Sequence, residues 1–146
     1  MFTTPYTHTT EFSKNHNGKL IMQYFPTVRL LNNKKYFTGA VHKITFKNLS
    51  LGIAEIVAVR EFPYKFINDN LSYIDCEMNA EKAKGMFFNM YKNRVENFTA
   101  ETKFVHVIFN WIERGLAETN NLLMTPLWDE IKEKFMYAHK EINYNN

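Results

Sequence analysis

Residues 51–60, LGIAEIVAVR, constrain the fold more than any other stretch of this chain. Alternate positions divide into a β-branched face and a small or apolar face, formed by Ile53, Val57 and Val59 and by Ala54, Ile56 and Ala58 respectively. A strand that is apolar on both faces needs cover on both sides, because neither face can be left to water. We therefore expect a strand inside a sheet that is covered on both faces.

Two further stretches have the β-branched and aromatic content that is typical of strands. They are residues 41–47, VHKITFK, and residues 103–112, KFVHVIFNWI. The sequence NLSLG between the first of them and the run at 51–60 is a turn signal. Residues 19–31 fit a strand, a helix or both, and their pattern does not decide.

Helix signals mark two other segments. In residues 79–93, Asn79 is a suitable N-cap for an apolar stripe at helical spacing. Residues 126–142 form the better-marked helix, with Thr125 as N-cap and Pro126 at the first helical position. At 146 residues the chain is one domain on ordinary size grounds. The order of elements predicts an α+β fold whose sheet is small enough to curl into a barrel. The terminal helix either packs on that barrel or offers a surface to a partner.

The basic residues are unevenly distributed along the chain. Between Glu11 and Glu55 there is no acidic residue, but there are seven basic ones: Lys14, Lys19, Arg29, Lys34, Lys35, Lys43 and Lys47. The rest of the chain holds the other 11 of the 18 basic residues and all 15 acidic ones. Such a block is typical of a surface for an anionic partner. The alternative is a solvated basic face without a partner.

Aromatic residues alternate with these basic ones, as a site for a nucleic acid or a modified nucleobase requires. Bases stack on aromatic faces, and Arg or Lys contacts phosphates and base edges. The candidate binding residues are Tyr24, Arg29, Lys34, Lys35, Tyr36 and Lys43. Arg29 is the preferred one, because its planar guanidinium can donate two parallel hydrogen bonds. We expect Phe25 and Phe37 to pack in the core.

Other classes of site lack their sequence signals. The five histidines have no metal-ligand spacing and Cys76 has no cysteine partner, so neither a metal site nor a cofactor is predicted. A single cysteine also excludes an internal disulfide and fits a reducing compartment. With no signal peptide and no apolar run of about 20 residues, we expect a cytoplasmic protein that does not bind membranes.

Four segments in order resemble the ASCH domains of the PUA-like superfamily. Residues 35–46, KYFTGAVHKITF, are similar to the family's glycine turn and following strand, and residues 52–59 to its next strand. Residues 66–91 are similar to its helical excursion, and residues 103–112 to its closing strand. The resemblance covers about residues 22–112. It implies a small PUA-like β-barrel with flanking helices, to which residues 126–142 add a C-terminal helix.

The family signature, Gly-x-Lys-x-x-Glu/Thr-x-Arg, lies about ten residues before the turn glycine. Counting back from Gly39 places its arginine at Arg29 and its threonine at Thr27. The lysine and glycine positions then fall on Tyr24 and Met22, so half of the signature is missing.

A second register, with Lys35 and Thr38 at the family's Lys-x-x-Thr spacing, is rejected. It puts Ala40 at the arginine position and uses up the turn that the next strand needs.

Some ASCH proteins are amidohydrolases that act on acylated cytidine, and the resemblance implies a Lys, a Thr and a Glu as their working residues. In this sequence Thr27 is the candidate nucleophile, and Glu77, or Asp75, is the candidate carboxylate. The lysine is absent from the favoured register. A nucleic-acid or nucleobase binding module is therefore preferred to a small hydrolase of a nucleoside amide. The third alternative is a protein-interaction or inhibitor factor, whose phage origin the Asn-, Lys- and Phe-rich composition would fit.

Overall fold

The computed structural model describes residues 2–115. Its strands are β1 (His8–Phe12), β2 (Tyr24–Leu30), β3 (Val41–Phe46), β4 (Leu49–Pro63) and β5 (Lys103–Arg114). Its helices are α1 (Asp69–Cys76), α2 (Ala80–Tyr91) and the short 3₁₀ helices η1 (His16–Ile21) and η2 (Tyr64–Phe66). The helix predicted over 126–142 lies outside the described residues.

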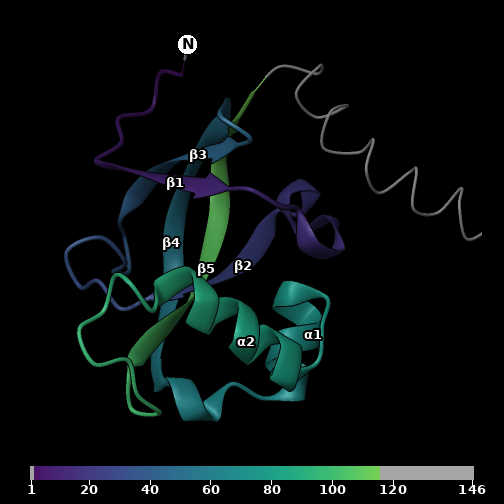
Figure 1. Cartoon of the computed structure of the whole chain (residues 1–146). Helices are drawn as coiled ribbons and strands as arrows, with labels where there is room; N and C mark the ends of the chain where they lie inside the picture. The colour runs from purple at the N-terminus through teal and green to yellow at the C-terminus, as the bar shows by residue number, and fades with distance from the viewer. Residues whose placement is uncertain (1, 116–146) are drawn as a thin grey trace, which may run out of the picture.

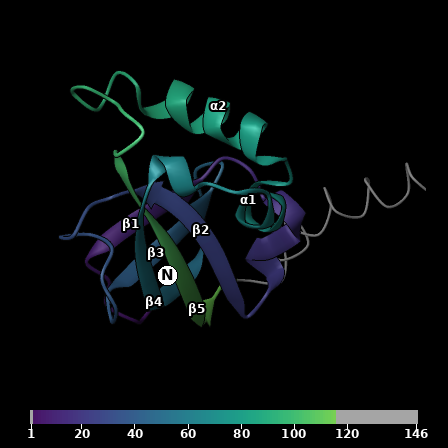
Figure 2. The same cartoon turned by 90° about the horizontal axis from the view of Figure 1, so that it is seen from below.

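The five strands form one mixed sheet in the order β1-β3-β4-β5-β2. β1 runs parallel to β3, and the other neighbouring pairs are antiparallel. β1 and β2 are therefore the two edge strands. Figures 1 and 2 show the sheet curled into a half-barrel, with α1 and α2 packed together on one side of it. The prediction of an α+β fold built on a small curled sheet is confirmed.

Three strands lie where the sequence predicts them. β3 covers all but the last residue of the predicted strand at 41–47, β5 contains the one at 103–112, and β4 extends the one at 51–60 at both ends. The undecided stretch at 19–31 contains two elements, because its start belongs to η1 and most of the rest is β2.

A bulge in β4 changes which of its residues face the core. Residues 51–54 are buried, as expected for a strand covered on both faces. The ladder to β5 then shifts between Ile56 and Ala58, which leaves Val57 as the extra residue of a β-bulge. The prediction of cover on both faces is wrong there, since Val57 is 39% exposed. The bulge also shifts the alternation by one residue, so that Val59 rather than Ala58 packs against the core.

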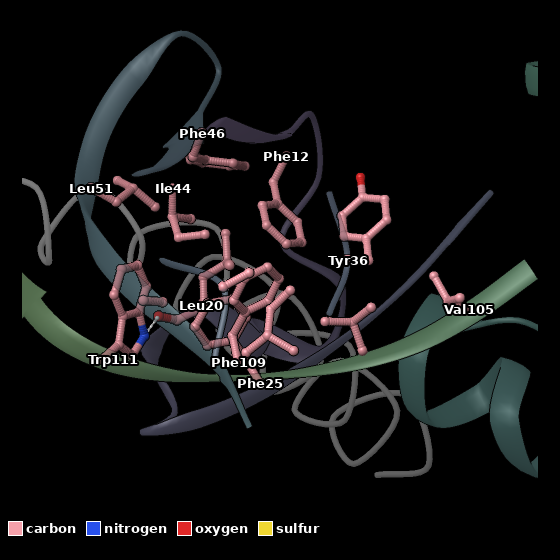
Figure 3. Close-up of a cluster of buried hydrophobic side chains, with 14 residues drawn as sticks. Phe12, Leu20, Phe25, Tyr36, Ile44, Phe46, Leu51, Val105, Phe109 and Trp111 are labelled. Atoms are coloured by element: carbon pink, nitrogen blue, oxygen red, sulfur yellow. Dashed lines mark hydrogen bonds between the residues drawn. The ribbon is translucent and has the colours of Figure 1, made fainter. Parts of the chain in front are cut away.

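The main core fills the inside of the curled sheet (Figure 3). The Phe25 ring lies 5.2 Å from that of Phe109 and 4.9 Å from that of Trp111, between centroids. The Trp111 indole Nε1 donates a hydrogen bond to the Leu20 carbonyl at 3.1 Å, which ties η1 to the core. Phe25 is therefore a core residue, as predicted.

Phe37 does not join this core, and its predicted placement is wrong. It lies in the loop between β2 and β3 and is 45% exposed. Gly39, with a φ of +93°, allows the turn in which the Ala40 amide donates to the Phe37 carbonyl at 3.0 Å. This turn leaves the Phe37 side chain at the surface, where its ring makes a T-shaped contact with that of His8.

A second cluster joins the two helices to β2 and β5. Phe87 and Tyr91 of α2 and Cys76 of α1 pack with Val28 and Phe104 of the strands. Both helices begin at asparagine N-caps, of which the one before α2 was predicted. None of the helices described in residues 2–115 is long and apolar enough to cross a membrane.

Candidate functional site

A cavity of about 340 Å³ opens between the two edge strands, under η1 and the two α-helices. Its polar lining includes Glu11, Lys19, Thr27, Arg29 and Asp75, and its apolar wall includes Phe12, Met86, Phe87 and Met90. We call this cavity the edge pocket. A mostly apolar cavity of this size with a few convergent polar groups is typical of a small-molecule or nucleobase site.

Arg29 extends from β2 across the gap to β1. Its Nε donates to the Thr27 Oγ1 at 3.0 Å, and its Nη2 donates to the Glu11 carbonyl oxygen at 2.9 Å. Its Cζ lies 4.7 Å from the centre of the Phe12 ring, in a cation–π arrangement. These contacts occupy two of the five guanidinium N–H groups. Within residues 2–115 the guanidinium is thus held in place at the pocket wall, with donors left for a ligand.

Lys19 and Asp75 form a buried ion pair in the same pocket. The Lys19 Nζ lies 3.2 Å from the Asp75 Oδ1 and donates to the Asp75 carbonyl at 3.2 Å. The two side chains are only 5% and 4% exposed. An unpaired charge is costly to bury, so the pair fixes η1 against α1.

Left-handed backbone in η1 turns Lys19 into the pocket. Asn17 and Gly18 have φ values of 57° and 64°, which a glycine or asparagine adopts most easily. The Asn17 side chain donates to the Tyr73 carbonyl at 2.9 Å and to the Ile74 carbonyl at 2.6 Å. A kink and two hydrogen bonds to α1 therefore position the lysine.

Lys35 and Tyr36 lie close enough to Arg29 to respond to its charge. Burial raises the pKa of Tyr36, and the Arg29 charge opposes this rise. Burial and the same charge both lower the pKa of Lys35, whose Nζ lies 5.4 Å from the centre of the Tyr36 ring.

The ring of His42 packs against that of Tyr36 and holds it in place. The two rings stack at a centroid distance of 5.8 Å. The His42 Nδ1 lies 2.8 Å from the Thr10 Oγ1, and its Nε2 lies 2.9 Å from the Lys35 carbonyl. Burial lowers the pKa of His42 to about 4, so the ring is neutral at pH 7. It then donates to the carbonyl and accepts from the hydroxyl, which fixes the loop that carries Tyr36.

Of the six candidate binding residues, only Arg29 lines the edge pocket. Lys34 is exposed in the turn that follows Asn32, and Tyr24 is exposed at the start of β2. Lys43 is half-buried on β3, with its Nζ 5.8 Å from the centre of the Tyr6 ring. Lys35 and Tyr36 lie near Arg29 without lining the pocket, and Tyr36 is buried in the main core. A binding role for the five residues outside the pocket stays a prediction.

The two candidate carboxylates occupy different positions. Glu77 follows α1 in an exposed, left-handed conformation, and its carboxylate accepts a hydrogen bond from the Asn17 backbone amide. Asp75, the alternative, lines the edge pocket together with Thr27. The pocket therefore contains a threonine hydroxyl, a lysine and a carboxylate.

Cys76 also lines the pocket, but it is not a nucleophile. Burial, followed by the adjacent Asp75 charge, raises the pKa of this thiol to about 12. The thiolate that attacks or binds metals is therefore absent at pH 7. Within residues 2–115, the structure shows no cluster of three or more His, Cys, Asp or Glu side chains suited to a metal ion.

Sequence reasoning missed the roles of Lys19 and Phe12. The signature register places the lysine at Tyr24, whereas the pocket receives its lysine from η1, five residues earlier. The available signal was the Asn17-Gly18 pair just before Lys19, because two adjacent residues that favour left-handed backbone indicate a kink.

Comparisons with known proteins were consistent with this architecture at the level of the fold. No family model matches the chain, and no curated protein matches it in sequence. An ASCH domain from Lactobacillus crispatus JV V101 superposes with a TM-score of 0.54 at 14% identity, over 75% of this chain and 82% of that one. The fold is that of an ASCH domain.

Two other solved structures share the ASCH-type fold with this chain. A DUF984 protein from Enterococcus faecalis V583 has a TM-score of 0.55 at 12% identity, covering 75% of this chain and 77% of its own. The hypothetical protein PH0355 has a TM-score of 0.53 at 11% identity, covering 72% and 98%. The ASCH resemblance seen in the sequence is thus confirmed for the fold.

Proposed function

We propose that the edge pocket binds an unpaired base, as part of a nucleic acid or as a modified nucleobase. The observation that carries this proposal is the Arg29 guanidinium, held by Thr27 and Glu11 against the Phe12 ring with N–H donors left over. A fixed, planar donor reads a base edge or a phosphate through paired hydrogen bonds. The ASCH-type fold is compatible with this function.

The other walls of the pocket suit the same ligand. Phe12, Phe87 and the methionines of α2 offer apolar surface to the faces of a base. Lys35 and the exposed Lys34 lie on the loop that follows β2, where they can meet the phosphates on either side of the bound base. We expect these lysines to contribute to affinity and to its salt dependence without selecting the base.

The test is fluorescence anisotropy with labelled single-stranded RNA, single-stranded DNA and duplex, at low and at physiological salt. We expect single strands to bind best, because their bases are free to enter a pocket. Arg29→Lys keeps the charge but loses the planar fork, and should weaken binding by about tenfold or more.

The lysines predict a different effect. Lys34→Ala combined with Lys35→Ala should reduce the slope of log affinity against log salt by roughly 0.7 for each single-strand phosphate that a lysine no longer neutralises. Lys92→Ala, at an exposed lysine that does not line the pocket and lies over the Phe88 ring, is the matched control. If neither the Arg29 nor the lysine substitutions change the affinity or its salt dependence, the proposed site is refuted. Lys43→Ala and Tyr24→Ala test whether the surface outside the pocket contributes.

A hydrolase of acylated nucleosides is the second candidate, and Lys19 favours it. The sequence register lacked a lysine beside Thr27, but the pocket contains one, paired with Asp75. In such a reaction the Thr27 hydroxyl attacks the amide carbonyl, and a neighbouring base takes its proton and passes it to the leaving amine as the C–N bond breaks. Water then hydrolyses the threonine ester and releases the acid. Thr27→Val removes the hydroxyl at nearly constant shape, and Thr27→Ser retains it. Turnover of N-acylated cytidine that survives in Thr27→Ser and is lost in Thr27→Val would support hydrolysis. If the unmodified protein shows no turnover, base binding stays as the one proposed function of the pocket.

A further inference from the structure

A second cavity, of about 430 Å³, lies between α1, η2 and the strands β4 and β5. We call it the outer groove, defined by Arg60 and Phe62 of β4, His106 of β5, Phe66 of η2, and Asn70 and Ile74 of α1. Val105 and Val107 pack in the core inside the sheet, so His106 between them points to the opposite face. The groove therefore lies on the outer face of the sheet, and none of its lining residues also lines the edge pocket.

Arg60 and His106 lie directly opposite each other on neighbouring strands of this face. They are register partners in the antiparallel ladder between β4 and β5. Side chains at such positions are about 5 Å apart at Cβ. No carboxylate forms an ion pair with Arg60 among residues 2–115, and none of the residues lining the groove is acidic.

One nitrogen of the His106 imidazole lacks a hydrogen-bond partner in the described part of the chain. This nitrogen is Nε2, and it is buried. Burial lowers the pKa of this histidine, with Lys19 and Arg60 acting in the same direction and Asp75 against them. At pH 7 the ring is thus neutral and carries one N–H, which can donate beside Arg60 without placing two positive charges together.

The rim of the groove offers apolar surface next to this cationic pair. Phe66 is 61% exposed and Ile74 is 65% exposed. An exposed phenylalanine ring is a stacking surface for a base of any identity. Cation, imidazole and aromatic face thus match the phosphate and the base of one nucleotide.

We propose that the outer groove binds a nucleotide, with its phosphate between Arg60 and His106 and its base on Phe66. This inference extends the proposed function, because a strand whose base enters the edge pocket can pass over α1 and place a neighbouring nucleotide here. A free mononucleotide has the same chemistry, so the groove is measured by itself.

The test is an NMR titration of the ¹⁵N-labelled full chain with AMP, with adenosine as the probe that lacks the phosphate. AMP should give saturable shifts at the amides of Arg60, Ile74 and His106, and adenosine should bind about tenfold more weakly or worse. Arg60→Gln, at an exposed position, and His106→Gln should each weaken AMP binding by a similar factor. Lys92→Gln, just after the end of α2, removes an exposed cation that does not line the groove and should leave AMP binding unchanged.

A second arm of the titration separates the two sources of phosphate. If a short single-stranded oligonucleotide shifts the groove amides and AMP does not, the groove binds the phosphate of a strand. If both shift these amides, the groove also binds free nucleotides. Equal affinity for AMP and adenosine, or shifts confined to the edge pocket with every ligand, would overturn the inference. In the latter case the proposed function would stand. Groove shifts by AMP that persist in Arg29→Lys, alongside lost strand binding, would show that the two sites are independent.

Discussion

At Gly52 the backbones of β4 and β5 approach each other closely. A Cβ atom at this position would lie 2.1 Å from the Glu113 carbonyl oxygen and 3.0 Å from the Trp111 ring. β4 curls over β5 here, beside a register shift between Ile53 and Ala54. Only a residue without a side chain allows this approach, so the curl of the half-barrel depends on one glycine.

Gly52→Ala should lower the free energy of unfolding by about 1–3 kcal/mol, because backbone atoms of two strands must move apart. Gly85→Ala is the matched control. Gly85 lies within α2 with open space around it, so the added methyl group should stabilise the protein by about 0.5–1 kcal/mol. Urea unfolding followed by circular dichroism measures both. A stable Gly52→Ala protein would show that the two strands separate easily.

Cys76 should be unreactive in the folded protein. With a pKa of about 12 and a buried position, its thiol should resist a disulfide reagent such as DTNB at pH 8 and react fully in denaturant. Rapid labelling without denaturant would contradict the packing described here for α1.

At the scale of elements, the buried pair of Lys19 and Asp75 holds η1 to α1. Lys19→Met should cost about 3–5 kcal/mol of stability, because it leaves an uncompensated carboxylate in the interior. Combining Lys19→Met with Asp75→Leu should restore much of this loss, because both charges are then gone. Thermal or urea unfolding of the two single variants and the double variant gives the coupling energy. Simple additivity of the two losses would show that the charges do not depend on each other.

Elements whose signal is local were predictable from the sequence. Residues 41–47, 51–60 and 103–112 carry their β-branched pattern within themselves, and Asn79 caps α2 by a contact three residues away. β1 was missed, because His8–Phe12 contains little apolar alternation and gains its place by pairing with β3, more than thirty positions along the chain.

The edge pocket was predictable only in part, for the same reason. Thr27 and Arg29 are two residues apart on one strand, so a signature can find them together. Lys19 joins them through a kink at Gly18, and Asp75 joins them through α1. No spacing in the sequence predicts that Lys19 and Asp75 join the pocket, because both positions depend on how the chain folds over the edge of the sheet.

For the whole molecule, several histidines act on stability in the same direction. Burial lowers the pKa of His16, of His42 and of His106 below the value in an unfolded chain. The unfolded chain therefore binds protons more readily, and stability is complete above about pH 6.5 and falls as the pH drops toward 4. For His42 alone, with a pKa of about 4, the loss is on the order of 3 kcal/mol.

Urea unfolding between pH 7.5 and 4.5 measures this loss. We expect the midpoint to fall steadily below pH 6.5, and His42→Gln to flatten part of the slope. A constant midpoint over this range would mean that these histidines bind protons with the same affinity in the folded protein as in the unfolded chain.

The basic block of the sequence is divided by the fold. Lys19 and Arg29 turn into the edge pocket, Lys34 and Lys35 lie on the loop beside it, and Lys43 lies on β3. One stretch of sequence thus supplies both the interior and the rim of a cavity. An excess of charge predicted a partner of opposite sign, but only the strand order shows which of these charges converge.

Arg29 has one more consequence for the molecule. The two edge strands are joined at this point by a guanidinium and an aromatic ring, where a closed barrel would have a backbone ladder. The seam of the half-barrel and the mouth of the pocket are therefore the same place. Any ligand that accepts the remaining hydrogen bonds of Arg29 also strengthens the contact between the two edge strands. Binding of such a ligand should therefore raise the melting temperature of the protein, by more at higher ligand concentration.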